Sequence, residues 1–61
     1  MENPKIGDRV LLAGDPLDAP PMTIISISIQ KKQTFCTVAH RDRDGKPNGI
    51  FEVDARELKA I

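Results

Sequence analysis

The stretch from Pro20 to Ile29, Pro-Pro-Met-Thr-Ile-Ile-Ser-Ile-Ser-Ile, constrains the fold of this chain more than any other segment. Its two prolines end whatever structure precedes them, because proline fixes φ and lacks an amide donor. A β-branched run follows in which isoleucines alternate with Ser26 and Ser28. Alternation with a period of two is typical of a strand that has one buried and one wetter face. We therefore expect a β-strand from Met22 to Ile29.

The alternation changes face within this strand. Met22 and Ile24 fall on the opposite side from Ile25, Ile27 and Ile29. Either both faces are partly covered, or a bulge near Ile24 and Ile25 moves the later isoleucines to the other face.

The rest of the chain offers short strands and breaker-rich loops but no long helix. Further strands are expected at residues 9–12, 34–40, 50–53 and 58–61, with loops at 14–21, 30–33 and 41–49. Asp54 and Glu57 have the spacing of a capping box, which predicts a single helical turn. This order predicts an all-β chain, a small five-stranded SH3-like barrel with one short terminal helical turn. Residues 1–5 form an N-terminal tail and residues 6–61 a single domain.

The expected core consists of the apolar residues on the inward side of these strands. Its members are Val10, Leu12, Ile25, Ile27, Phe35, Val38, Phe51, Val53 and Leu58, with Ile24 and Ile29 as further candidates.

Chain length and cysteine content restrict how the fold is stabilised. A chain of 61 residues buries only about 60% of its unfolded surface. Cys36 is the only cysteine, so no disulfide forms within the chain. Its strand context predicts a buried structural thiol. A catalytic role would need a base such as His40, but four residues of strand separate the two by roughly 13 Å.

The charges balance, with nine basic and nine acidic residues. A nucleic-acid binder usually has a basic excess, and this chain has none overall. The chain has no apolar run near 20 residues and no basic-then-apolar start, so neither a membrane span nor a signal peptide is expected. Together with the free thiol, this pattern favours the cytoplasm.

Spaced residues along nearly the whole chain resemble a known family. They are the opening Gly7-Asp8-x-Val10-x-Leu12, then Pro21-Met22-Thr23-Ile24, Cys36-x-Val38, Asp44-Gly45, Phe51 and Leu58. This set is similar to the small bacterial YodC-like family, which the resemblance implies to be an SH3-like barrel without an established activity. The family's paired glycines are replaced here by Asp18-Ala19-Pro20, and its tryptophan by Val38.

The opening Gly7-Asp8-Arg9-Val10 also resembles the plasmid-borne type II dihydrofolate reductase. That enzyme is implied to be an SH3-like barrel whose four copies surround one pore. A Gln and a Tyr of its closing strand contact cofactor and substrate. Gly49 and Phe51 stand in those places here, which removes an amide and a hydroxyl.

The segment from His40 to Gly45 has the spacing of a calcium loop but not its ligands. His40 stands at the first ligand position and Phe51 at the twelfth, while Arg41 and Arg43 oppose the charge of a cation site. A solvated hairpin end with local Arg–Asp pairs is the favoured interpretation. No metal and no cofactor is expected.

Two groups of basic residues lie at separate hairpins. Lys31 and Lys32 fall at one, and Arg41, Arg43 and Lys46 at the next. With both phenylalanines assigned to the core, no aromatic surface remains for stacking nucleic-acid bases.

We therefore expect a non-enzymatic interaction module that binds a protein partner or itself through its loops and an edge strand. A nucleic-acid-binding adaptor and a tetrameric pore reductase are the alternatives. The candidate binding residues lie on loops, where function concentrates on rigid scaffolds. They are Arg41, Arg43 and Lys46, followed by Asp15, Pro20 and Pro21.

Overall fold

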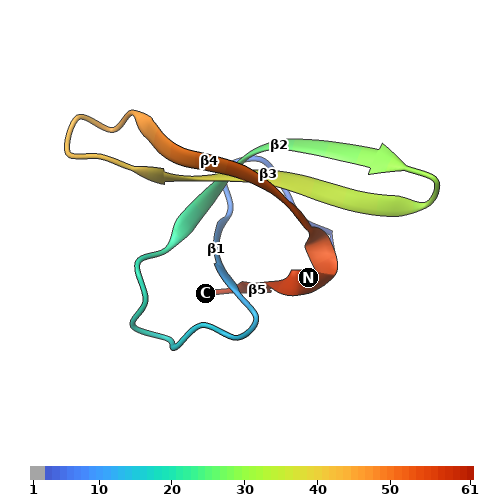
Figure 1. Ribbon diagram of the computed structural model, residues 1–61, viewed down its shortest axis with the longest axis horizontal. Helices are drawn as coiled ribbons and strands as arrows, with labels where there is room; N and C mark the ends of the chain where they lie inside the picture. The colour runs from blue at the N-terminus through green and yellow to red at the C-terminus, as the bar shows by residue number, and fades with distance from the viewer. Residues whose placement is uncertain (1–2) are drawn as a thin grey trace.

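A computed structural model describes residues 3–61 as one antiparallel sheet of five strands (Figure 1). The strands are β1 (Arg9–Leu12), β2 (Met22–Gln30), β3 (Gln33–Arg41), β4 (Pro47–Asp54) and β5 (Leu58–Ala60), and a 3-10 turn, η1 (Ala55–Glu57), joins β4 to β5. The order across the sheet is β4-β3-β2-β1-β5. The predicted all-β class, with five strands and one terminal turn, is confirmed. Nowhere in residues 3–61 is there a helix with the length and apolarity to span a bilayer.

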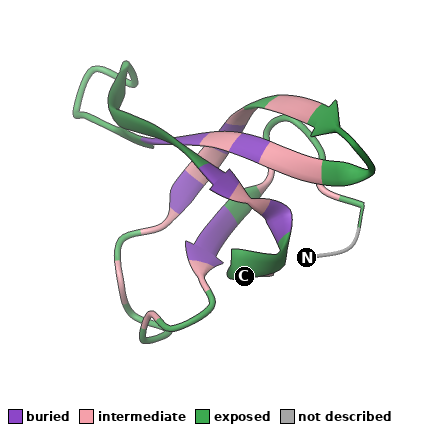
Figure 2. Cartoon of the chain, turned by 45° about the vertical axis from the view of Figure 1, so that its right-hand side comes forward, coloured by how far each residue is buried: buried purple, intermediate pink, exposed green. Residues whose placement is uncertain are grey.

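The sheet is long and strongly bent. The β2–β3 and β3–β4 hairpins extend in opposite directions, while β1 and β5 pair below their crossing (Figure 1). Buried residues gather where the strands cross, and both hairpin ends are exposed (Figure 2). The chain therefore has one small core with two projecting hairpins.

A bulge at Ile25 resolves the change of face in β2. Ile24 lies opposite Val38, and Ser26 lies opposite Thr37, so β2 advances by two residues while β3 advances by one. Ile25 is the extra residue, and the residues after it are turned to the other face. The bulge that the sequence offered as one alternative is confirmed.

The core lies on one face of the sheet. Its buried cluster consists of Val10, Met22, Ile24, Cys36, Val38, Val53, Ala55 and Leu58, with Leu12 and Ile27 packed against it. Ile27, which follows the bulge, lies opposite Cys36. The prediction that Cys36 is buried is confirmed.

Four core predictions are wrong. Phe51 is 40% exposed, because it lies on β4 at the edge of the sheet with no strand beyond it. Ile29 is 73% exposed, because the end of the β2–β3 hairpin extends past the paired part of β1. Ile25 is only half-buried at its bulge. Phe35 is also only half-buried, because it alternates to the face of β3 away from the core cluster. Leu11, which was not assigned to the core, is fully buried outside the main cluster.

The predicted loop at 41–49 is shorter in the structure. Arg41 still belongs to β3 and lies opposite Pro47, the first residue of β4. Only residues 42–46 form the turn. The sequence favoured a loop because Asn48 and Gly49 are turn residues, but strand pairing continues through both.

Gly49 accommodates a second bulge, this time in β4. Val38 lies opposite Phe51 and His40 opposite Asn48, so β4 has one residue more than β3 between these pairs. Gly49 has φ +64° at this point. Glycine adopts this left-handed conformation without the steric cost of a Cβ.

Candidate functional site

The end of the β3–β4 hairpin is built around the side chain of Asp42. Its Oδ1 accepts hydrogen bonds from the backbone amides of Asp44 and Lys46, both at 2.9 Å. The backbone carbonyl of Asp42 also accepts from the Gly45 amide at 3.0 Å. The predicted Arg–Asp pairs are absent from this hairpin, all of which the structure describes: the Asp42 side chain binds backbone amides, and the Asp44 carboxylate forms no ion pair with its neighbouring arginines. Arg43 and Lys46 are left exposed beside it.

Arg41 is held against this turn by its own side chain. A guanidinium nitrogen of Arg41 donates to the Gly45 carbonyl oxygen at 2.8 Å. The rest of the guanidinium stays available, because one contact uses one of its five N–H groups.

A row of residues crosses three strands next to this arginine. Arg9 lies opposite Thr23 and Thr23 lies opposite Ala39, so these residues of β1, β2 and β3 share one face of the sheet. Arg41 follows Ala39 by two residues and falls on the same face. Ala39 is fully buried, and Thr23 lies between it and Arg9.

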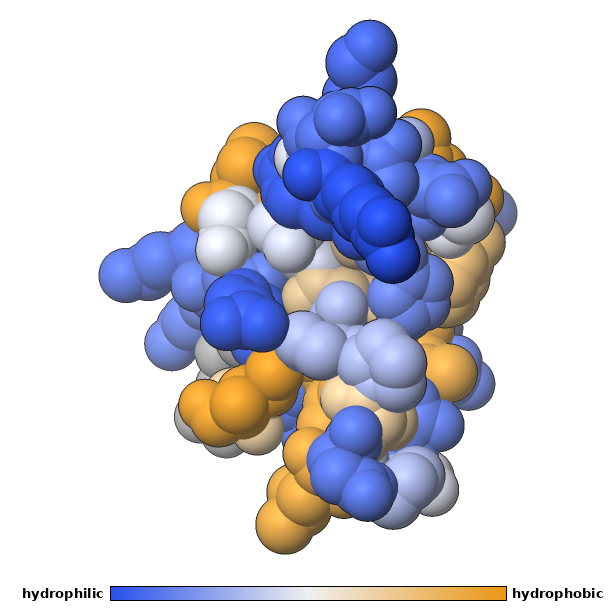
Figure 3. Space-filling model, turned by 90° about the vertical axis from the view of Figure 1, so that its left-hand side faces the viewer, coloured by the Kyte–Doolittle hydropathy of each residue, from blue (hydrophilic) through white to orange (hydrophobic). Residues whose placement is uncertain are grey.

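This row borders an open hollow at one side of the molecule, here named the basic hollow. Its lining consists of Gly7, Arg9, Pro20, Pro21, Thr23, His40 and Arg41. Its lining includes Pro20 and Pro21 of the 13–21 loop and Arg41 of the β3–β4 hairpin, two segments that project from the same side of the molecule (Figure 1). Seen from that side, strongly hydrophilic side chains cover the upper part and apolar side chains gather below (Figure 3).

Three of the predicted binding residues meet in the basic hollow. Arg41 comes from β3, while Pro20 and Pro21 come from the breaker-rich loop. Arg9 and Thr23 were not predicted. Both belong to segments that carry the family resemblances, but only the pairing of β1 with β2 brings them to the same place.

Asp15 lies apart from this group. It borders a separate open hollow with Leu12, Arg56 and Glu57. Its backbone carbonyl accepts a hydrogen bond from the Lys59 ammonium at 2.5 Å, which ties the loop to β5. Arg43 and Lys46 are exposed on the hairpin and do not line the basic hollow.

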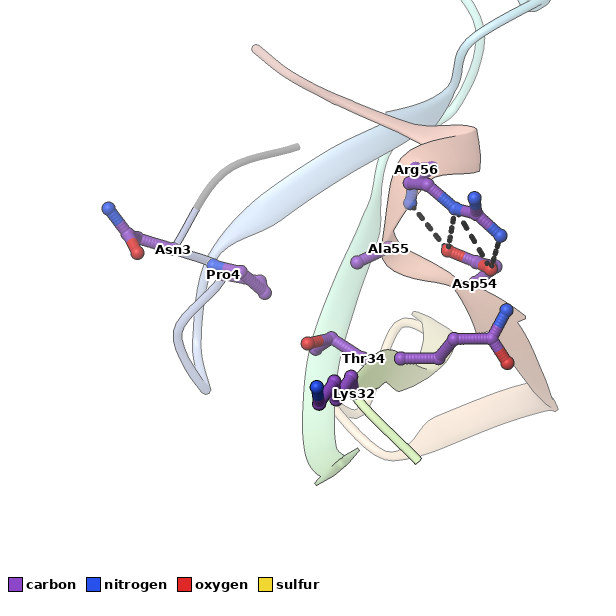
Figure 4. A pocket seen from close by; sticks show the side chains of 8 residues that line it. Asn3, Pro4, Lys32, Thr34, Asp54, Ala55 and Arg56 are labelled. Carbon is purple, nitrogen blue, oxygen red and sulfur yellow. Dashed lines mark hydrogen bonds and ion pairs between the residues drawn. The ribbon is translucent and has the colours of Figure 1, made fainter. Parts of the chain in front are cut away.

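The turn after β4 contains an ion pair between neighbouring residues. The Asp54 Oδ1 accepts from the Arg56 backbone amide at 2.9 Å, and the Arg56 guanidinium folds back onto Oδ2 at 2.8 Å (Figure 4). Hydrogen bonds from the Arg56 side chain, and then from its amide, lower the pKa of Asp54 below its ordinary value. The predicted capping box is therefore wrong. Arg56 supplies the amide expected from Glu57, because η1 is only three residues long.

The free edge of β4 exposes two large apolar side chains in succession. Ile50 is 58% exposed and Phe51 is 40% exposed. The residues from Pro47 to Glu52 are all exposed. We refer to residues 47–52 as the β4 edge.

The described residues offer little for covalent or metal chemistry. Burial raises the pKa of the Cys36 thiol, which keeps it protonated and unreactive. His40 is exposed and lies four residues further along β3. Among residues 3–61, no three or more His, Cys, Asp or Glu side chains group where they could hold a metal ion.

No protein-family model, no curated protein and no solved structure has significant similarity to this chain. The function is therefore inferred from the basic hollow and the β4 edge.

Proposed function

We propose that this protein is a non-enzymatic interaction module that associates with a second copy of itself through the β4 edge. The observation that carries the proposal is the exposure of Ile50 and Phe51 on a long edge strand. Unpaired edge strands present free backbone donors and acceptors to another strand.

Strand addition explains why two successive apolar residues are exposed. Neighbouring residues of a strand point to opposite faces. Phe51 lies on the face of Val38, its partner on β3, and Ile50 lies on the other face. A partner docked on one face would cover only one of these side chains, whereas a strand added along β4 borders both.

The opposite edge of the sheet is poorly suited to this role. β5 has only three residues, while β4 has eight. Short edge strands are one of the ways in which proteins avoid association.

The charges near β4 favour a second copy as the occupant. The basic residue Lys46 directly precedes the strand, and the exposed acidic residue Glu52 lies toward its end, whereas Asp54 is already paired with Arg56. Antiparallel pairing of two β4 strands places the basic end of one copy beside the acidic end of the other. The two-fold axis of such a dimer repeats this contact at both ends of the seam, the line along which the two β4 strands pair. The chain carries no net charge to oppose association.

The fold that we propose for this module is the SH3-like barrel of the YodC-like family. The order of strand, long loop, two hairpins, 3-10 turn and closing strand supports it, as does the pairing of β1 with both β2 and β5. The Gly7-Asp8-x-Val10-x-Leu12 opening leads directly into β1.

The molar mass in solution tests self-association. Light scattering on a sizing column, from low to high micromolar protein, is expected to show a monomer–dimer equilibrium. The seam is short, so its buried area falls below the ~1,200 Å² of standard interfaces and the dimer should dissociate on dilution. Ile50→Lys places a charge at the seam and is expected to give a monomer at every concentration.

Leu17→Lys is the matched control. Leu17 is 84% exposed but lies in the loop before β2, away from the β4 edge. This variant should dimerise like the parent protein. A monomeric parent at the highest concentration, a tetramer, or equal loss of dimer in both variants would contradict the proposal.

A further inference from the structure

We infer that the basic hollow binds the phosphodiester backbone of a single-stranded nucleic acid. This site is independent of the β4 edge, because its residues come from β1, β2, β3 and the loop before β2.

The charge of the lining distinguishes this hollow from the others. Its ionisable residues are Arg9, His40 and Arg41, all of them basic. The hollow beside η1 contains Asp54 next to its arginine, and the hollow beside Asp15 also contains Glu57. An unopposed pair of arginines is the side-chain chemistry that recognises phosphate oxygens.

The geometry places these donors on one surface. Arg9, Thr23 and Arg41 lie on one face of the sheet and line the hollow together, and Thr23 adds a hydroxyl beside Arg9. The contact of Arg41 with the Gly45 carbonyl fixes its guanidinium at the hairpin. Within residues 3–61, the Arg9 side chain forms no hydrogen bond or ion pair, so its whole guanidinium is available.

The surroundings favour a chain over a small ligand. The hollow is open, and the exposed cations Arg43 and Lys46 continue from Arg41 along the hairpin. Asp42 in this hairpin directs its Oδ1 to backbone amides. Asp44 is exposed, and with three cations and two aspartates residues 41–46 keep a net positive charge. A polymer with a phosphate at every residue can contact the hollow and the hairpin at once, whereas a free phosphate contacts only one of them.

Its position favours a single strand. The lining joins Pro20 and Pro21, at the end of the 13–21 loop, to Arg41, the last residue of β3 before the turn of the β3–β4 hairpin. Both segments project from the sheet on this side (Figure 1), and they hinder the approach of a rigid duplex. Phe51 lies on the opposite face from Thr23, and Phe35, which shares the face of Ala39, lies four residues before it on β3 and does not line the hollow. The lining that the structure describes therefore contains no phenylalanine for stacking. We expect weak sequence preference and strong salt dependence, because the contacts are to the backbone.

Fluorescence anisotropy of a labelled oligothymidine of about ten nucleotides tests the assignment with the full chain. Phosphate contacts from the four cations Arg9, Arg41, Arg43 and Lys46 predict a slope of about −3 in a plot of log K against log salt concentration. Arg9→Glu and Arg41→Glu are each expected to weaken binding at least tenfold. Arg41→Lys keeps the charge and should retain most of the affinity. Thermal unfolding checks that each variant is folded, which their exposed positions favour.

The double variant Lys31→Glu/Lys32→Glu is the control. It reverses two exposed charges at the end of the other hairpin, on the far side of the sheet from the hollow (Figure 1). Its affinity should stay within twofold of the parent protein. An equal loss in this control, or no binding at low salt, would overturn the inference.

Three competitors separate the sources of phosphate. A duplex of the same length and a phosphoserine peptide are expected to compete poorly. Tighter binding of either would overturn the assignment to a single strand. Full displacement by inorganic phosphate at constant ionic strength would instead assign the hollow to a free anion. Weak competition by all three supports the inference.

Discussion

Asp54 binds Arg56 twice, through the backbone amide at 2.9 Å and through the guanidinium at 2.8 Å. The Arg56 side chain is 76% exposed, whereas that of Asp54 is 18% exposed. Both contacts favour the charged carboxylate, and they lower the pKa of Asp54. The turn that joins β4 to β5 therefore depends on the ionisation of one side chain.

This dependence predicts a loss of stability in acid. The folded protein holds Asp54 deprotonated at a lower pH than the unfolded chain does. The ionised Asp54 therefore raises the free energy of unfolding above the ordinary pKa of aspartate, about 4. This stabilisation is lost as the pH falls through the lower pKa of the folded state. Asp54→Asn keeps an oxygen that can accept the Arg56 amide bond but removes the charge. The thermal unfolding midpoints of the parent protein and of Asp54→Asn should differ most near neutral pH and converge in acid. Parallel curves for the two proteins would contradict the prediction.

Gly49 is expected to be intolerant of a side chain for a conformational reason. Its φ is +64°, and a Cβ built there would lie 3.8 Å from Cδ2 of His40, which is an ordinary contact. The cost of Gly49→Ala therefore comes from the left-handed backbone and is about 1–2 kcal/mol. Gly14→Ala is the control, because Gly14 has no such φ and no atom within 4 Å. Denaturant unfolding should show a lower free energy of unfolding for Gly49→Ala only. Equal losses in both variants would exclude the left-handed backbone as the cause.

The local signals of the sequence predicted the strands well. The strand at 9–12 matches β1 to the residue, and the strand at 22–29 ends one residue short of β2. The alternation of isoleucine and serine also indicated the bulge at Ile25, because a change of face inside one strand needs an extra residue. These features depend on neighbours in the sequence.

Features that depend on strand order could not be predicted in this way. Phe51 has the character of a core residue, but only the order of the sheet shows that β4 is an edge. The row of Arg9, Thr23 and Ala39 likewise needs the register of three strands. Pro20, Pro21 and Arg41 were predicted as binding residues because they fall in expected loops, whereas Arg9 belongs to a strand and was not predicted.

The β2–β3 turn is expected to be improved by substitution. Lys31 and Lys32 form its two-residue loop between the paired Gln30 and Gln33, with φ of +48° and +67°. Positive φ at both positions belongs to a type I′ turn, which prefers Asn-Gly. Lys31→Asn/Lys32→Gly should therefore raise the free energy of unfolding by about 1 kcal/mol.

A charge-matched variant separates conformation from electrostatics at this turn. Lys31→Ala/Lys32→Ala removes the same two charges but leaves a Cβ at both positions. A urea titration of this alanine variant should show no increase in the free energy of unfolding. If the alanine pair stabilises the protein as much as Asn-Gly does, repulsion between the lysines is the cause, and the conformational explanation is wrong.

Cys36 provides a probe of how often the core opens. The side chain is fully buried opposite Ile27 and Val53, and burial raises the pKa of its thiol. Thiol reagents attack the exposed thiolate, so labelling of the native protein requires opening of the sheet. We expect the native protein to react at least about a hundredfold more slowly than the protein in denaturant.

A cysteine at the exposed position 26, introduced by Ser26→Cys together with Cys36→Ala, is the control and should react at nearly the same rate in both states. Similar native rates at the two positions would mean that the β2–β3 ribbon is open most of the time, and would contradict the closed core.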